Sequence, residues 1–131
     1  MTVTPILAFL LAAAAPSPPV QPPAQVGECR TLRGRAFLAN GTPSVRMWVV
    51  GTRRILGVVQ QDESYGDLPA PLRHAWDRSG GERWHTDVYG NFTVCAVTRS
   101  RPGHMQMVRI AGARNLLARP REQRAPGGPR P

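Results

Sequence analysis

The chain has 131 residues and a formal net charge of +9. Hydrophobic residues make up 41% of it, which allows one modest core and excludes several independent domains. Every basic residue is an arginine, a choice that GC-rich coding also favours. The charge therefore predicts attraction to anionic polymers or surfaces without defining a partner.

Residues 1–15 predict an export signal that is removed from the mature protein. The segment is apolar, lacks charged side chains and ends in a run of alanines, as expected for an apolar region followed by a small-residue cleavage zone. No arginine or lysine precedes the apolar run, so a buried N-terminal helix is the alternative. A Pro-rich linker follows at residues 16–27. We expect a secreted or periplasmic protein with no transmembrane segment after cleavage, because no other apolar run reaches this length.

Two cysteines in an exported chain predict one structural disulfide, between Cys29 and Cys95. In the chain-entropy account, a loop of this length contributes roughly 4 kcal/mol to stability. Glu28 places a charge where a lipid-modified Cys29 needs a small apolar residue, so lipidation is disfavoured. Two isolated cysteines do not make a metal-ligand set, and we expect neither a metal site nor a cofactor.

Alternating residues predict three strands in the first half of a domain that spans residues 28–118. The strands cover residues 30–40, 44–51 and 55–60. An Asn-Gly pair supports a turn between the first two. One face of these two strands carries Leu32, Gly34, Ala36, Leu38, Val45, Met47 and Val49, and the other carries Arg33, Arg35, Phe37, Arg46, Trp48 and Val50.

Residues 61–81 interrupt the strand pattern. Their proline, glycine and acidic residues predict an inserted loop with a short helix at residues 70–76, in which Pro71 suits the first turn. Long structured loops often carry function. We therefore expect the functional surface in this insert.

Residues 86–98 predict a tight turn followed by a strand. Gly90 is expected to take a positive φ in the turn at residues 87–91, while Phe92 and Val94 are expected to fill the core.

Residues 104–111 predict another strand, and residues 113–117 a last strand or a helical turn. The composition of residues 119–131 predicts a disordered basic tail.

The order of these features resembles the transthyretin-like sandwich of the carboxypeptidase regulatory-like and collagen-adhesin repeat type. The matching features are Gly34, the Asn-Gly-Thr-Pro turn at 40–43, the Val-rich strand at 45–50 and the Thr-Asp-Val-Tyr-Gly-Asn-Phe motif at 86–92. The resemblance implies an all-β fold, a single small antiparallel β-sandwich of about seven strands with one inserted loop or short helix and disordered ends. The chain has no lysine for the Lys–Asn crosslink of some adhesin-type relatives. It also lacks the Tyr-Arg-Gly-Ser-type terminus of the enzymatic branch.

The histidines offer little for catalysis. His74, His85 and His104 include no pair at a metal-ligand spacing. His85 and Asp87 could serve as an oriented base in a small hydrolase-like enzyme, and a half-buried strand histidine is the alternative. No nucleophile motif or acid pair appears, so we expect no catalytic residues and no enzymatic activity.

Tyr65, Trp76 and Trp84 are the candidates for a ligand-facing surface, because aromatic and arginine side chains stack on sugar rings and planar groups. The alternatives are anchoring of the loops and, for Trp48, core packing. We predict an exported, non-enzymatic β-sandwich that acts as an accessory or binding module of the cell envelope.

The expected partner is an anionic envelope polymer or another envelope protein. Nucleic acid is not expected, because no binding motif accompanies the charge. The hydrolase-like enzyme and a structural envelope protein that binds anionic polymers through arginine are the alternative functions.

Overall fold

The computed structural model describes residues 2–3, 25–61, 65–78 and 82–121. The predicted export signal, apart from residues 2 and 3, and most of the predicted linker lie outside the described residues. So do residues 122–131 of the predicted tail.

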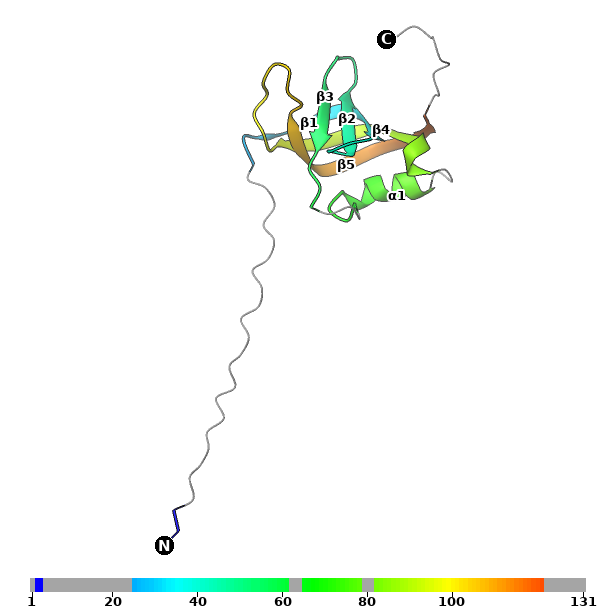
Figure 1. Cartoon of the computed structure of the whole chain (residues 1–131). Coiled ribbons are helices and arrows are strands. Elements are labelled where there is room, and N and C mark those ends of the chain that lie inside the picture. The colour runs from blue at the N-terminus through cyan, green and yellow to red at the C-terminus, as the bar shows by residue number, and fades with distance from the viewer. Residues whose placement is uncertain (1, 4–24, 62–64, 79–81, 122–131) are drawn as a thin grey trace.

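Five strands close into one barrel in the order β1-β2-β3-β5-β4 (Figure 1). The elements are β1 (Cys29–Leu38), β2 (Val45–Val49), β3 (Ile55–Val58), α1 (Ala70–Arg78), the 3₁₀ helix η1 (Arg83–His85), β4 (Thr86–Ala96) and β5 (Met107–Pro120). Neighbouring strands run antiparallel, except that β3 and β5 pair in parallel.

The predicted predominantly β architecture is confirmed, but the described strands form one closed sheet and not a seven-strand sandwich. The difference comes from strand length. Segments that were expected to form a turn and several short strands form two long ones, β4 and β5. Because each of these strands pairs on both sides along part of its length, the sheet closes on itself.

Period-two alternation places one side of each strand inside the barrel. Ala36 and Leu38 of β1 and Met47 of β2 are almost completely buried, as are Phe92 and Val94 of β4. The two-sided alternation predicted for β1 and β2 is thus confirmed, and the face that carries Ala36 and Met47 points inward. The core consists of Ala36, Leu38, Val45, Met47, Leu56, Val58, Leu68, Leu72, Ala75, Trp76, Val88, Phe92, Val94, Val108 and Ile110.

The helix α1 lies below the barrel in Figure 1 and packs against β4 and β5. Its apolar face, Leu72, Ala75 and Trp76, is buried in the core. Pro71 lies in the first turn, where a missing backbone N–H costs no intrahelical hydrogen bond. The short helix predicted within the insert is therefore confirmed.

The tight turn predicted at residues 87–91 is wrong, because these residues lie inside the continuous strand β4. Gly90 does not have a positive φ. A Cβ atom at this position would overlap the Leu116 side chain and lie 3.1 Å from the Arg114 carbonyl oxygen. The glycine thus allows close approach of β5 at a place where the β4–β5 register shifts.

Gly34 has a similar role on the neighbouring strand, directly opposite Gly90 in the β1–β4 register. A Cβ atom there would lie 2.8 Å from the Met47 sulfur and 3.1 Å from the Phe92 ring. Gly34 thus leaves room for Met47 and Phe92, and Gly90 for Leu116.

The chain end that was predicted to be a tail from residue 119 in fact begins as ordered strand. Arg119 and Pro120 belong to β5. The Arg121 backbone N–H then donates to the His85 carbonyl oxygen at 2.7 Å. The domain therefore continues beyond the predicted boundary at residue 118.

The predicted disulfide between Cys29 and Cys95 is confirmed. The two residues are direct partners in the β1–β4 register, with Cα atoms 4.1 Å apart. The bond joins the start of β1 to the end of β4. Within the described ranges, no helix has the length and apolar character needed to cross a membrane.

Candidate functional site

The outer surface of β2, β1 and β4 carries arginine and aromatic side chains side by side. Arg35 of β1 lies between Trp48 of β2 and Tyr89 of β4 in the strand registers, and Phe37 lies opposite Arg46. Residues directly opposite each other in a sheet project from the same face. We call this surface the arginine–aromatic face, which consists of Arg33, Arg35, Phe37, Arg46, Trp48 and Tyr89.

Arg35 is at the centre of this face. Its guanidinium carbon lies 5.2 Å from the centroid of the Phe37 ring and 5.1 Å from that of the Trp48 ring. Both distances fit cation–π contact. The buried Nε atom has no hydrogen-bond partner, and the Asp87 carboxylate lies 3.8 Å away. Two rings and an ion pair therefore hold the guanidinium in place.

The Trp48 ring has a fixed orientation on the outside of the barrel. Its indole N–H donates to the Thr52 carbonyl oxygen at 2.7 Å, in the turn between β2 and β3. Core packing, the alternative considered for Trp48, is therefore wrong. The half-buried ring instead presents a face to Arg35.

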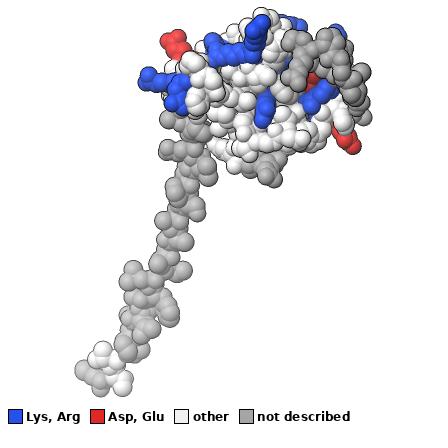
Figure 2. Space-filling model, turned by 45° about the horizontal axis from the view of Figure 1, so that its top comes forward, with Lys and Arg blue, Asp and Glu red and all other residues white. Residues whose placement is uncertain are grey.

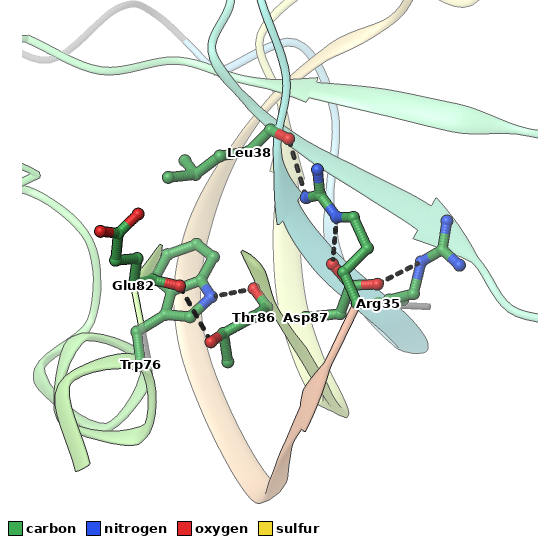
Figure 3. A network of polar contacts seen from close by, with 7 residues as sticks. Arg35, Leu38, Trp76, Glu82, Thr86 and Asp87 are labelled. Carbon is green, nitrogen blue, oxygen red and sulfur yellow. Dashed lines mark hydrogen bonds and ion pairs between the residues drawn. The ribbon is translucent and has the colours of Figure 1, made fainter. Parts of the chain in front are cut away.

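Asp87 links the face to the end of the domain. Its side chain is almost buried, and its carboxylate accepts a hydrogen bond from Arg121 Nε at 3.0 Å, in addition to the ion pair with Arg35. Arg121 also donates from Nη2 to the Leu38 carbonyl oxygen at 2.8 Å. Figure 3 shows Asp87 next to Arg35 and beside the end of the strand that carries Leu38. One carboxylate thus lies between two guanidinium groups.

A hollow of about 390 Å³ opens beside this carboxylate. We call it the Asp87 hollow, and it is lined by Arg35, Phe37, Asp87, Tyr89, Arg119, Pro120 and Arg121. The lining carries three positive charges and one negative charge. Figure 2 shows basic side chains dispersed over one face of the barrel, with acidic side chains at only a few separate places. The hollow is therefore suited to an anionic group.

The three residues predicted to face a ligand do not form one surface. Trp76 is fully buried, and its indole N–H donates to the Thr86 carbonyl oxygen at 3.0 Å, as Figure 3 shows, so it packs in the core. Tyr65 is half-buried against the core, with the Arg83 guanidinium 5.3 Å from its ring centroid. Trp84 is exposed on η1.

Tyr65 also lines a second hollow of about 560 Å³. Ser44 and Gln60 of its lining are hydrogen-bonded to each other. This hollow carries no charged side chain among its described residues.

The structure does not bring His85 and Asp87 together as an acid–base pair. The His85 imidazole is exposed on η1, with Nε2 3.8 Å from the Glu82 carboxylate. The Asp87 carboxylate contacts Arg35 and Arg121 instead. Within the described ranges, no cluster of three or more His, Cys, Asp or Glu side chains could hold a metal ion.

The sequence reasoning missed the residues that the structure brings together, although a signal was available. Two successive strands were predicted to carry arginine and aromatic residues together on one face, Arg35 with Phe37 and Arg46 with Trp48. The sequence does not show the β1–β2 and β1–β4 registers, which place Arg35 opposite Trp48 and Tyr89. Arg121 was not considered because it was assigned to the tail.

The order of the strands and the position of the helix allow the barrel to be compared with known architectures. A closed five-stranded barrel with this strand order, and with its helix between β3 and β4, has the arrangement of an OB-fold. No protein-family model, curated protein or solved structure matches the chain. Because one fold supports many functions, the function has to be argued from the arginine–aromatic face.

Proposed function

We propose that this protein is a non-enzymatic binding module of the cell envelope that holds an anionic linear polymer across its arginine–aromatic face. The observation that carries the proposal is the position of Arg35 between the Phe37 and Trp48 rings. A guanidinium held in this way has few conformations to lose when a ligand binds. The Arg35 side chain is partly exposed, and the Trp48 and Tyr89 residues lie beside it on the same outer face, where a polymer can reach both charge and rings.

The chemistry of the face supports a polymer with both charges and rings. Arginine neutralises the negative charges, and aromatic side chains stack on flat or ring-shaped units. Arg33, Arg35 and Arg46 lie on two adjacent strands that are roughly 5 Å apart, so several charges face one extended chain. Barrels of this arrangement often bind oligonucleotides or oligosaccharides, which is a supporting analogy.

The compartment favours an envelope polysaccharide over nucleic acid. A disulfide is typical of a chain that leaves the reducing cytosol. The predicted export signal agrees with this location. We therefore place the protein outside the cytosol, secreted or periplasmic, where acidic glycans are the abundant anionic polymers.

The geometry gives less support to a hydrolase. The two residues considered for catalysis, His85 and Asp87, have separate partners, and the Asp87 carboxylate is engaged by two arginines. A carboxylate held in this way is poorly placed to orient a general base.

Retention on an immobilised acidic polysaccharide, such as polygalacturonate, tests the proposal. The oxidised protein should bind this matrix, elute with increasing salt and pass through a neutral dextran matrix. The variants Arg35→Gln and Trp48→Ala should each weaken binding about tenfold, because each removes one contact of the face.

The matched control is Arg99→Gln, which removes the same charge beyond the far end of β4. Arg99 is exposed and lies after Ala96, whereas Asp87 is near the start of the strand. The control should bind nearly as well as the unmodified protein. Equal losses in Arg99→Gln and Arg35→Gln would show that only total charge matters and would contradict the proposal.

A further inference from the structure

We infer that the Asp87 hollow binds a single anionic sugar unit of the polymer, through the carboxylate or phosphate that the unit carries. The inference rests on the proposed function and goes further, because it names the unit that is recognised and the residues that select it.

The charges around the hollow point to an oxyanion. The one carboxylate in the lining, Asp87, is almost buried and already engaged by Arg35 and Arg121. Arg119 lies opposite Asp87 in the β4–β5 register, and its side chain makes no hydrogen bond or ion pair with any described residue. The Arg35 side chain likewise donates no hydrogen bond within the part of the chain that the structure describes. Two guanidinium groups with open donors therefore share one hollow.

Asp87 acts as a positioning residue in this arrangement. Its ion pairs hold Arg35 and Arg121 at the rim, where three guanidinium groups would otherwise repel one another. Because a guanidinium presents a planar set of donors that matches a carboxylate or a phosphate, an oxyanion in the hollow can be held by two hydrogen bonds at once.

The uncharged residues that line the hollow indicate that the anionic group belongs to a sugar ring. Tyr89, Phe37 and Pro120 contribute flat apolar surface next to the arginines. Such surface packs against the C–H faces of a sugar and adds nothing for a small free ion. A volume of about 390 Å³ lies near the lower end of the range for small-molecule pockets, which suits one or two sugar units.

The test uses small probes on the ¹⁵N-labelled, oxidised protein. Glucuronate and glucose 6-phosphate each carry one oxyanion on the same ring, and glucose carries none. We expect saturable shifts of the Arg35 and Arg119 Nε–H resonances with at least one charged probe and none with glucose. The charged probe with the lower Kd identifies the carboxylate or the phosphate as the native group.

The variant Arg119→Gln should weaken binding of the charged probe about tenfold, whereas Arg99→Gln should leave it unchanged. Arg119→Gln is suitable because the Arg119 side chain is exposed and forms no hydrogen bond or ion pair with a described residue that its loss would break. Unmoved arginine resonances with both charged probes would overturn the inference. Equal affinities of Arg119→Gln and Arg99→Gln for the charged probe would also overturn it. A third contrary result would be displacement of a bound oligogalacturonate by a thymidine oligonucleotide of equal charge, because that would favour a nucleic acid as the ligand.

Failure of this inference is distinguishable from failure of the proposed function. If the polymer is retained with its dependence on Arg35 and Trp48 while neither charged probe binds, only the sugar-unit assignment is wrong. If the unmodified protein is not retained on any anionic polysaccharide, the proposed function is wrong and the assignment fails with it.

Discussion

Trp48 and Trp76 show how differently one residue type is used inside and outside this barrel. Trp76 is fully buried, and its indole N–H is satisfied by the Thr86 carbonyl oxygen within the core. Trp48 is on the outer surface, where its N–H is satisfied at a turn and its ring face contacts Arg35. Stability should therefore depend on the interior that contains Trp76, and recognition on the face that contains Trp48. Substitutions in the two regions should have separable effects.

The largest loss of stability is expected from Trp76→Ala. Removing a fully buried indole leaves a cavity between α1 and the barrel and should lower the free energy of unfolding by about 3–5 kcal/mol. Urea denaturation followed by far-UV circular dichroism measures this change. Trp84→Ala is the matched control, because Trp84 is 42% exposed and its loss should cost about 1 kcal/mol or less. Equal losses in both variants would contradict the buried packing of α1.

Loss of the disulfide should have the next largest effect. The double variant Cys29→Ala/Cys95→Ala should lower the free energy of unfolding by about 2–5 kcal/mol, because the unfolded chain regains the freedom of a long loop. Denaturation of the unmodified protein with and without a reducing agent gives an independent estimate. Two titratable thiols in the oxidised, denatured protein would show that the bond is not formed.

Gly90→Ala probes the interior at the contact between β4 and β5. The added methyl group meets the Leu116 side chain and the Arg114 carbonyl oxygen, so the variant should lose about 1–3 kcal/mol. Gly112→Ala on β5 is the control, since its Cβ atom meets nothing closer than 3.7 Å. If Gly90→Ala were as stable as Gly112→Ala, the close approach of the two strands would be wrong.

The smallest loss of stability is expected on the outer face. Trp48→Ala removes a half-buried ring and one hydrogen bond and should cost about 1 kcal/mol. Its effect on retention by the acidic polysaccharide should be about tenfold, as for Arg35→Gln. A Trp48→Ala variant that unfolds as easily as Trp76→Ala would remove the distinction between the two regions.

The parts of the fold that depend on local chemistry could be predicted from the sequence. The alternation in β1 and β2 placed Ala36 and Met47, which are buried, on the opposite face from Arg35. The Cys29–Cys95 bond could be predicted because the chain has only two cysteines and carries a predicted export signal. The first-turn preference of proline supported α1. Each of these inferences needs only a few neighbouring residues or a count.

The parts that depend on distant pairing could not be predicted. Gly90 in an Asp-to-Asn segment is typical of a turn, but contact with the Arg114–Leu116 region keeps it in an extended strand. Nothing local indicates that β3 and β5 pair in parallel and close the sheet. The same limit applies to the candidate site, because Arg35 meets Trp48, Tyr89 and Arg121 only after the barrel has formed.

The anchoring of Arg121 has a practical consequence for anyone who purifies this protein. Its side chain is held between Asp87 and the Leu38 carbonyl oxygen, so a polypeptide joined directly after Arg121 would start at the rim of the Asp87 hollow. Val26 is bonded instead to Ala96 at the opposite end of β4, roughly 30 Å away along the strand. A charged tag joined directly before Val26 would therefore start far from the hollow, whereas one joined directly after Arg121 would start next to the arginines that line it.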